Sequence, residues 1–415
     1  MIGHRRPPLL LSAGGLALFV GFLYILFQLG NSEYPRNPTS YIHRSDSSLL
    51  DDAKNSTLGF ERIYVINLPE RTDRRDALLL MADLTGIKLT FIEGVRGNVV
   101  PDKALPPEAS HATMKDATIG SWRGHLNALV HMLEHDVSSA LIMEDDIDWD
   151  VRIKTQMRDY ARASQALTQP LANNPTKFAD SSFIDPRHNT NPAQNDLKYE
   201  ALPRTATPRN SPYGDNWDVA WLGHCGVTFP NLANKERLEV SQGLPRGRVI
   251  RHNDETVAEH HHLSALTKED DIRSVMPQHT RVYHHVKGVI CSLAYGVSRR
   301  GAQSLLNEFG LKKFNEPYDL ILRDACEGIK GRARHICLSV QPQLFNHHFK
   351  AGNASHMSDI SAHEGVFEKS WTGNIRYSTR LNIPKLLAGQ TDYDDQLPDK
   401  NPSHQSPEGP EHEHP

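Results

Sequence analysis

The sequence lacks an excess of positive charge. Its 415 residues include 46 lysines and arginines against 50 aspartates and glutamates, which gives a formal net charge of −4 at pH 7. A nucleic-acid-binding protein needs a basic face, so this balance argues against nucleic acid as a partner. Internal repeats are absent, and cysteine is scarce, with four residues. Hydrophobic residues nevertheless make up 38% of the chain, which is enough to build a core.

The few cysteines still allow cross-links. Cys225, Cys291, Cys326 and Cys337 form an even number, and in an oxidising compartment they permit two disulfides with three possible connectivities. Cys326 and Cys337 are close enough in sequence to make one plausible pair. The alternative is four reduced, buried thiols, and the sequence leaves both states open.

Long apolar runs are also rare, and the one at the N-terminus is the clearest. Residues 9–30 are uncharged, and about 20 residues span a bilayer as a helix. His4, Arg5 and Arg6 precede this run, and the positive-inside rule keeps that side cytosolic. A cleaved signal peptide is the alternative, although its apolar core usually has only about 7–15 residues. We therefore expect a cytosolic tail over residues 1–8 and a single-pass type II signal anchor over 9–30 in the Golgi or ER membrane.

The rest of the chain would then lie in the lumen. Two acceptor sequons for N-glycosylation, Asn55-Ser56-Thr57 and Asn353-Ala354-Ser355, agree with that placement. Residues 31–59 are polar with scattered proline and serine, which predicts a stem. A catalytic domain is expected over residues 60–390. The Asp-, Pro- and His-rich residues 391–415 predict a disordered tail.

Strand and helix patterns alternate along the expected domain. This order predicts an α/β fold with a parallel sheet. The expected strands are 63–68, 89–92, 140–143, 218–223, 292–297 and 334–340, and the expected helices are 71–84, 119–134 and 299–309. Two polar stretches with little periodicity, about 169–215 and 231–278, predict disordered insertions.

An acidic triplet follows one of the expected strands. Glu144-Asp145-Asp146 comes directly after the apolar residues 140–143, and ligands of open α/β sheets bind beyond the carboxyl ends of strands. Three adjacent carboxylates do not all stay ionised cheaply unless a cation or water screens them. A hard divalent ion such as Mg²⁺ or Mn²⁺ prefers oxygen ligands and commonly bridges substrate phosphates. The triplet therefore suits a metal–diphosphate site, and a solvated acidic turn is the alternative.

Further blocks of sequence occur in order between about residues 60 and 380. They are Arg62–Leu68 followed by Arg71, Asp73 and Arg74, then Gly120–His125, Ala140–Asp146, Cys291–Ala302, Pro342–Phe345 and Ser358–Ile360. In this order they resemble glycosyltransferase family 25, which includes bacterial lipooligosaccharide glycosyltransferases and procollagen galactosyltransferases. The two insertions interrupt the blocks. Gly124 is a departure, because the family usually has serine just before the histidine of the second block.

The resemblance implies a GT-A-like fold, with a Rossmann-type, mostly parallel sheet flanked by helices. It also implies a UDP-sugar donor and often galactose transfer with inversion. Glu144, Asp145 and Asp146 would then hold Mn²⁺ or another divalent cation against the donor diphosphate, and Asp146 would be a catalytic residue. Inversion needs one more carboxylate to deprotonate the acceptor hydroxyl. Asp319, near an acidic position of the family, is the candidate, and a helix-capping aspartate after Pro317 is the alternative.

Four further residues are candidates for donor binding. Asn67 ends the first expected strand and is placed to contact the nucleotide. Arg71 and Arg74 begin the next helix, where guanidinium groups suit phosphates and where a cation opposes the helix dipole, although solvated surface charge is the alternative. His125 is either a donor contact or a buried, hydrogen-bonded histidine.

The sequence thus predicts a metal-dependent transferase that moves a sugar from a UDP-sugar to a glycan or glycoprotein acceptor. The alternative is a transferase-like lectin or chaperone of the secretory pathway that has lost catalysis. The intact acidic triplet argues against that alternative. The adjacent histidines at 260–262, 284–285 and 347–348 lack the ligand spacing of a structural zinc site.

Overall fold

The computed structural model describes residues 46–187, 196–230, 239–240, 243–264, 272–356, 358–359 and 364–400. Within them no helix is long and apolar enough to cross a membrane. The anchor predicted over residues 9–30 and the tail predicted over 1–8 lie outside the described residues.

A twelve-stranded sheet forms the centre of the described body. Nine strands follow one another in the order β2 (Thr90–Glu93), β1 (Arg62–Asn67), β3 (Ser139–Glu144), β11 (Ala294–Ser298), β8 (Val219–Gly223), β12 (Cys337–Gln341), β10 (Arg281–His285), β9 (Arg248–Arg251) and β7 (Asp196–Lys198). Next to them, β13 (Phe345–Phe349) pairs with β8, with β4 (Ile147–Trp149) and with β16 (Trp371–Thr372).

The strand directions confirm the predicted α/β class with a mostly parallel sheet. In the nine-strand order, only β11 and β10 run against the other strands. The sheet is therefore mixed, and this architecture fits a GT-A-like fold. β11 lies between β3 and β8, antiparallel to both, so the loop before β11 meets the ends of its neighbours at one edge of the sheet. That edge carries the acidic triplet.

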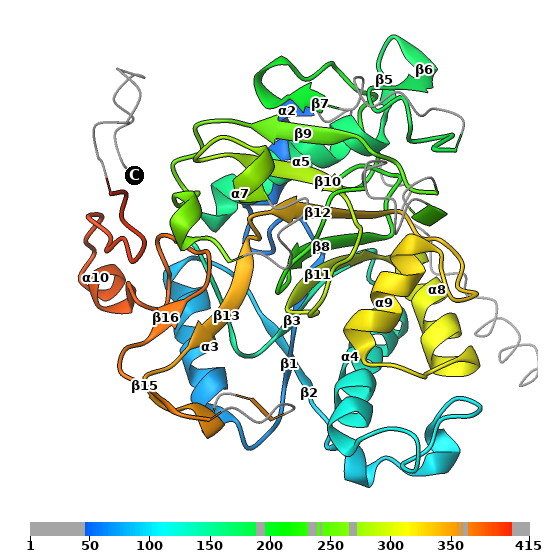
Figure 1. The fold of residues 1–415 in the computed structure, drawn as a ribbon, viewed down its shortest axis with the longest axis vertical. Coiled ribbons are helices and arrows are strands. Elements are labelled where there is room, and N and C mark those ends of the chain that lie inside the picture. Colours follow the sequence, from blue (N-terminus) through cyan, green and yellow to red (C-terminus); the bar gives the residue numbers. More distant parts are fainter. Residues whose placement is uncertain are drawn as a thin grey trace, which may run out of the picture. The chain divides into compact units, whose positions relative to one another are not determined.

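Helices cover both faces of the sheet because successive side chains of a strand point to opposite sides. Ile63 and Val65 of β1 pack in one core cluster with α3 (Thr72–Leu84) and α5 (Ile153–Thr168). Tyr64 packs in a second cluster with α4 (Asp116–Glu134), α8 (Arg299–Leu305) and α9 (Tyr318–Glu327). Figure 1 shows α4, α8 and α9 together on one side of β1 and β3, and α3 on the other.

The elements expected from apolar patterns appear within a few residues of their predicted bounds. The expected helix at 299–309 is α8, continued by a π-helical segment at Leu306–Lys312. Helix α9 begins after Pro317 and ends at Gly328, whose φ of 66° is the left-handed cap that glycine adopts most readily. Shorter elements are α2 (Asp46–Asp51), β5 (Pro170–Leu171), β6 (Asn174–Phe178), α7 (Ile272–Val275), β14 (Gly352–Asn353), β15 (Val366–Phe367) and α10 (Ile383–Leu387).

The prediction of a disordered insertion at 169–215 is corrected for its described residues. They form the β5–β6 hairpin and the edge strand β7, which runs parallel to β9. Tyr199 and Tyr213 are buried in the core, and the Tyr213 ring stacks on Phe60 with 4.7 Å between centroids. Isolated aromatic residues among polar ones form no periodic pattern in the sequence. Their side chains are nevertheless part of the close-packed core.

Three other predicted segment boundaries also differ from the structure. The described part of the insertion predicted at 231–278 contains β9 and α7, and Val249 lies in the core. The segment predicted as a stem up to residue 59 includes α2 and the fully buried Leu58, so its described residues belong to the folded body. In the tail predicted from 391, Gln396 Nε2 donates a hydrogen bond to the Thr372 carbonyl over 3.0 Å.

All four cysteines are paired. Cys326 of α9 bonds to Cys337 of β12, which confirms the pair expected from their spacing and ties this helix to the sheet. Cys225, two residues after the end of β8, bonds to Cys291 in the loop before β11. The alternative of four reduced thiols is therefore wrong in this structure, and the second disulfide lies at the edge that carries the acidic triplet.

Candidate active site

A cavity of about 900 Å³ opens at the carboxyl ends of β1 and β3. Six of the residues singled out from the sequence line it: Arg74, His125, Glu144, Asp145, Asp146 and Asp319. Asn67 and Arg71 contact the lining rather than form it, since Asn67 bonds to Asp145 and Arg71 pairs with Asp359. The structure thus brings the candidate residues together around one space.

The three side chains of the acidic triplet point in two different directions. β3 ends at Glu144, a turn follows, and β4 begins at Ile147. Glu144 and Asp146 converge with His347, and ligand atoms of these three side chains all lie within 4.8 Å of one another. Asp145 is not part of this group.

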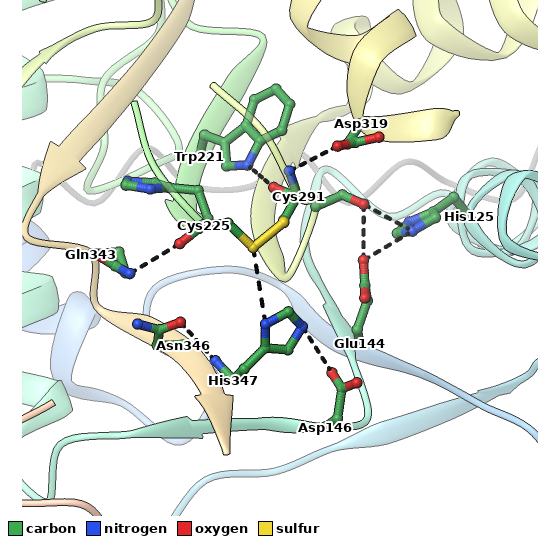
Figure 2. Close-up of a disulfide and its surroundings, with 12 residues drawn as sticks. His125, Glu144, Asp146, Trp221, Cys225, Cys291, Asp319, Gln343, Asn346 and His347 are labelled. Atoms are coloured by element: carbon green, nitrogen blue, oxygen red, sulfur yellow. Dashed lines mark hydrogen bonds and ion pairs between the residues drawn. A yellow bond between two sulfur atoms is a disulfide. The ribbon is translucent and has the colours of Figure 1, made fainter. Parts of the chain in front are cut away.

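The third member, His347, comes from a strand far along the chain. β13 runs antiparallel to β4, which pairs His347 with Ile147, and the backbone N–H of His348 donates to the Asp146 carbonyl over 2.9 Å. His347 Nε2 lies 3.8 Å from Asp146 Oδ1 (Figure 2). That carboxylate oxygen is buried and accepts no hydrogen bond from the described residues. Two carboxylates and an imidazole with an unpartnered oxygen fit a divalent cation such as Mn²⁺.

Glu144 is oriented by a polar network on its other side. Ser292 Oγ donates to Glu144 Oε1 over 2.9 Å, and His125 Nε2 lies 3.3 Å from Ser292 Oγ and 3.6 Å from Glu144 Oε1. The His125 ring stacks on Tyr318 with 4.1 Å between centroids. Burial raises the pKa of Glu144, but the hydrogen bond and charge of His125, with the charge of His347 and the Ser292 hydrogen bond, hold this pKa below its usual value. Glu144 is therefore kept ionised, and His125 is a buried histidine that also reaches the cavity.

Asp145 belongs to a separate ion-pair cluster. Asn67 Nδ2 donates to its Oδ2 over 2.7 Å, and Arg74 pairs with its Oδ1. Burial raises the pKa of Asp145 to about 6, although Arg74 opposes that shift. Asp145 was predicted as a metal ligand, but the structure directs its carboxylate to Asn67 and Arg74 instead. It pairs there with the buried Arg74 guanidinium, which also lies beside Asp146.

The two arginines are engaged with carboxylates. Arg74 Nη2 lies 3.4 Å from Asp146 Oδ2, and its Nη1 lies 3.8 Å from Asp359 Oδ2. Arg71 pairs with Asp359 and with Asp73, the latter over 3.0 Å. Burial lowers the pKa of Arg74, but the neighbouring Asp146 and Asp145 together have the larger, opposite effect. The pKa of Arg74 is therefore raised above its usual value, and the side chain is cationic. The arginines balance the acidic turn, and their contact with a donor phosphate stays a prediction.

Asp319 lies in the first turn of α9 and faces the cavity. Its Oδ2 accepts a hydrogen bond from the backbone N–H of Cys291 over 2.8 Å (Figure 2). This partner belongs to another segment of the chain, so the carboxylate orients the loop before β11 instead of capping its own helix. Asp319 thus presents a carboxylate to the cavity, and its role as a base stays a prediction.

Sequence reasoning missed His347 and Ser292. His347-His348 was examined only against the ligand spacing of structural zinc sites, which adjacent histidines fail. The available signal was the position of His347 just after the block Pro342–Phe345. Its convergence with the triplet depends on the pairing of β13 with β4, and a single sequence does not show strand pairing.

Fold and cavity define an α/β protein with a candidate cation site beyond a parallel strand. Residues 60–200 match the family described as Glycosyltransferase family 25 (LPS biosynthesis protein). The match confirms the resemblance to family 25 and supports a glycosyltransferase.

Individual relatives agree with the family match. A Glycosyltransferase 25 family member of Anopheles gambiae is 30% identical over 115 residues, which cover 25% of this chain and 19% of the relative. Another of Drosophila melanogaster is 28% identical over 127 residues, 26% of this chain and 21% of the relative. Procollagen galactosyltransferase 2 of Homo sapiens is 27% identical over 111 residues, 24% of this chain and 18% of the relative. The chain spans about a fifth of the length of these relatives.

Proposed function

We propose that this chain is a metal-dependent glycosyltransferase that moves a sugar from a UDP-sugar donor to a glycan or glycoprotein acceptor. The observation that carries the proposal is the convergence of Glu144, Asp146 and His347 at the cavity of about 900 Å³. Galactose is the sugar suggested by the resemblance and by the name of the human relative. Inversion at the anomeric carbon follows the same resemblance.

In this mechanism Glu144, Asp146 and His347 would hold Mn²⁺ or another divalent cation. Bound there, the cation would supply charge neutralisation for the departing UDP diphosphate. Asp319 would accept the proton of the acceptor hydroxyl while the hydroxyl oxygen bonds to the anomeric carbon and the bond from that carbon to the diphosphate breaks. The Cys291 N–H holds one oxygen of Asp319, so the carboxylate keeps a set orientation during this transfer.

The proposal places the body in the lumen of the Golgi or ER, anchored by residues 9–30. Two disulfides suit an oxidising compartment. Asn55 and Asn353, the acceptor residues of the two sequons, are exposed. Removal of N-glycans with a glycosidase should therefore lower the mass of the protein purified from a eukaryotic host. Cleavage of the body by protease added outside intact vesicles would contradict a lumenal placement.

The test of activity is UDP release from a panel of UDP-sugars by the purified protein, with and without Mn²⁺. We expect release that requires Mn²⁺ and that Asp146→Asn abolishes. The matched control is Asp102→Asn, an exposed aspartate that pairs with His111 and does not line the cavity. Absence of release from every donor, together with sugar binding that survives Asp146→Asn, would favour the alternative of a catalytically inactive lectin or chaperone.

A further inference from the structure

The Cys225–Cys291 disulfide lies in the wall of the candidate active site. Both cysteines line the same cavity as Glu144 and Asp146, whereas Cys326 and Cys337 do not. Figure 2 shows the disulfide between His347 on one side and Asp319 on the other. The two bonded cysteines therefore contact residues on both sides of the site.

On the first side, the disulfide favours one of the two tautomers of His347. Cys225 Sγ lies 3.9 Å from His347 Nδ1. A disulfide sulfur carries no hydrogen, so only an Nδ1–H can make this contact a hydrogen bond. In the neutral imidazole the lone pair is then on Nε2, the atom that lies 3.8 Å from Asp146 Oδ1. The Asn346 side chain accepts the backbone N–H of His347 over 2.8 Å and further limits its position.

A reduced Cys225 would not impose this choice. A thiol can donate its S–H to Nδ1, which would place the imidazole hydrogen on Nε2 and aim it at the cation position. A protonated Nε2 is not a metal ligand. The oxidised pair thus selects the tautomer of His347 that is able to bind a cation, as the outer hydrogen-bond partners of ligating histidines generally do.

On the second side, the disulfide anchors the segment that orients two carboxylates. The backbone N–H of Cys291 donates to Asp319, and Ser292 Oγ donates to Glu144 over 2.9 Å. Cys291 has a φ of 64°, a left-handed conformation that persists only where the surroundings enforce it. Its carbonyl accepts the indole N–H of Trp221 over 3.0 Å, so a covalent bond and two hydrogen bonds hold this backbone in place.

We propose that the Cys225–Cys291 disulfide is a positioning element of the active site, which selects the cation-binding tautomer of His347 and orients Asp319. The proposal rests on the proposed function of the same cavity. Its consequence is that cation affinity depends on the oxidation state of this pair. Reduction by a dithiol breaks the S–S bond to two thiols, while the dithiol supplies two electrons and two protons and becomes a disulfide itself.

The test compares the double variant Cys225→Ala/Cys291→Ala with the matched variant Cys326→Ala/Cys337→Ala in the full chain. The matched pair also joins two elements, but it lies outside the cavity lining. For the first variant we expect the Mn²⁺ concentration at half-maximal UDP release to rise about 10- to 100-fold, the range for lost partners of metal ligands. At saturating Mn²⁺ we expect kcat to fall while KM for the donor stays within about twofold, a split that general destabilisation does not produce. Equal Mn²⁺ dependence in both variants would overturn the proposal.

A second measurement keeps the proposal testable if the first variant does not fold. The Cys326→Ala/Cys337→Ala chain retains only the Cys225–Cys291 disulfide, so treatment with dithiothreitol reduces that bond alone. Mn²⁺ binding is then measured by electron paramagnetic resonance before and after reduction, with two thiols counted per chain and with circular dichroism confirming the fold. Weaker binding after reduction is expected, and unchanged affinity would contradict the proposal. Because this readout needs no donor, Mn²⁺ binding without UDP release would reject the transferase function separately.

Discussion

His347 Nε2 faces Asp146 Oδ1 across 3.8 Å, and that oxygen accepts no hydrogen bond from the described residues. Two acceptors in this arrangement repel each other unless a proton or a metal ion lies between them. Glu144 completes the group from the end of β3. Strand β13, late in the chain, and the turn after β3, early in the chain, thereby both contribute side chains to one candidate cation site.

Replacement of the imidazole should remove this cation site. We expect His347→Ala to weaken Mn²⁺ binding more than about 100-fold, because even the partners of metal ligands are worth 10- to 100-fold. The measurement is a Mn²⁺ titration followed by electron paramagnetic resonance. His135→Ala is the control, since His135 is an exposed residue at the end of α4. Unaltered Mn²⁺ affinity in His347→Ala would exclude His347 from the ligand set.

Ser292→Ala should affect the same site through Glu144. The variant removes the hydroxyl that donates to Glu144 Oε1 and leaves the carboxylate less well oriented, so we expect a 10- to 100-fold loss of Mn²⁺ affinity. Ser298→Ala is a matched control. Ser298 caps α8 by accepting the N–H of Gly301, and its loss should cost about 1 kcal/mol of stability without changing Mn²⁺ affinity. A similar loss of affinity in both variants would mean that general destabilisation explains the effect.

Asp319→Asn tests the proposed base independently of the candidate cation site. The amide oxygen can still accept the Cys291 N–H, but an amide does not take up a proton. We expect kcat of sugar transfer to fall about 10²- to 10⁴-fold, the usual contribution of a general base, with Mn²⁺ binding unchanged. Steady-state kinetics at saturating donor, acceptor and Mn²⁺ provides the measurement. Full activity of Asp319→Asn would assign the base to another residue.

The buried Asp145 should make stability depend on pH in mildly acidic solution. Its pKa is raised from 3.8 to about 6 in the folded state, so between these values the folded protein holds a proton that the unfolded chain releases. Stability from this group is therefore present below about pH 4 and falls as pH rises to about 6. The shift of about 2 units corresponds to about 3 kcal/mol.

Asp145→Asn removes that dependence, because an amide does not titrate. Chemical denaturation at several pH values should show that the free energy of unfolding of the variant, relative to the wild type, increases between pH 4 and pH 6. Asp76→Asn, an exposed position on α3, is the control. A constant difference across this range would show that Asp145 has no raised pKa.

Tyr213 tests whether the segment 169–215 belongs to the body. The side chain is fully buried against Phe60 and Trp217. Tyr213→Ala should lower the free energy of unfolding by about 3–5 kcal/mol, as loss of a large buried aromatic does. Lys177→Ala, on the exposed part of β6, should change it by less than about 0.5 kcal/mol. A small effect at Tyr213 would mean that this segment adds little to the core.

The α/β class and six of the twelve strands of the sheet could be predicted from the sequence because their signals are local. Ile63 and Val65 belong to an apolar run, and the residues before Glu144 form another, so each strand is visible within a few residues. The folded residues 169–187 and 196–215 were not visible, since Tyr199 and Tyr213 are separated by polar residues and their burial depends on distant partners. The same holds for the described residues before 60, where Leu58 packs into the core.

For the site, the sequence by itself determined that three carboxylates follow a buried strand and that the surrounding blocks resemble family 25. Only the tertiary structure decided how the triplet divides. The turn after β3 directs Asp145 to Arg74 and Asn67, and strand pairing brings His347 beside Asp146. The tertiary structure also decided that Cys225 bonds to Cys291, which places Cys225 beside His347 and Cys291 beside Asp319. Local patterns reveal where a strand ends, whereas ligand sets and cross-links depend on which distant segments the fold brings together.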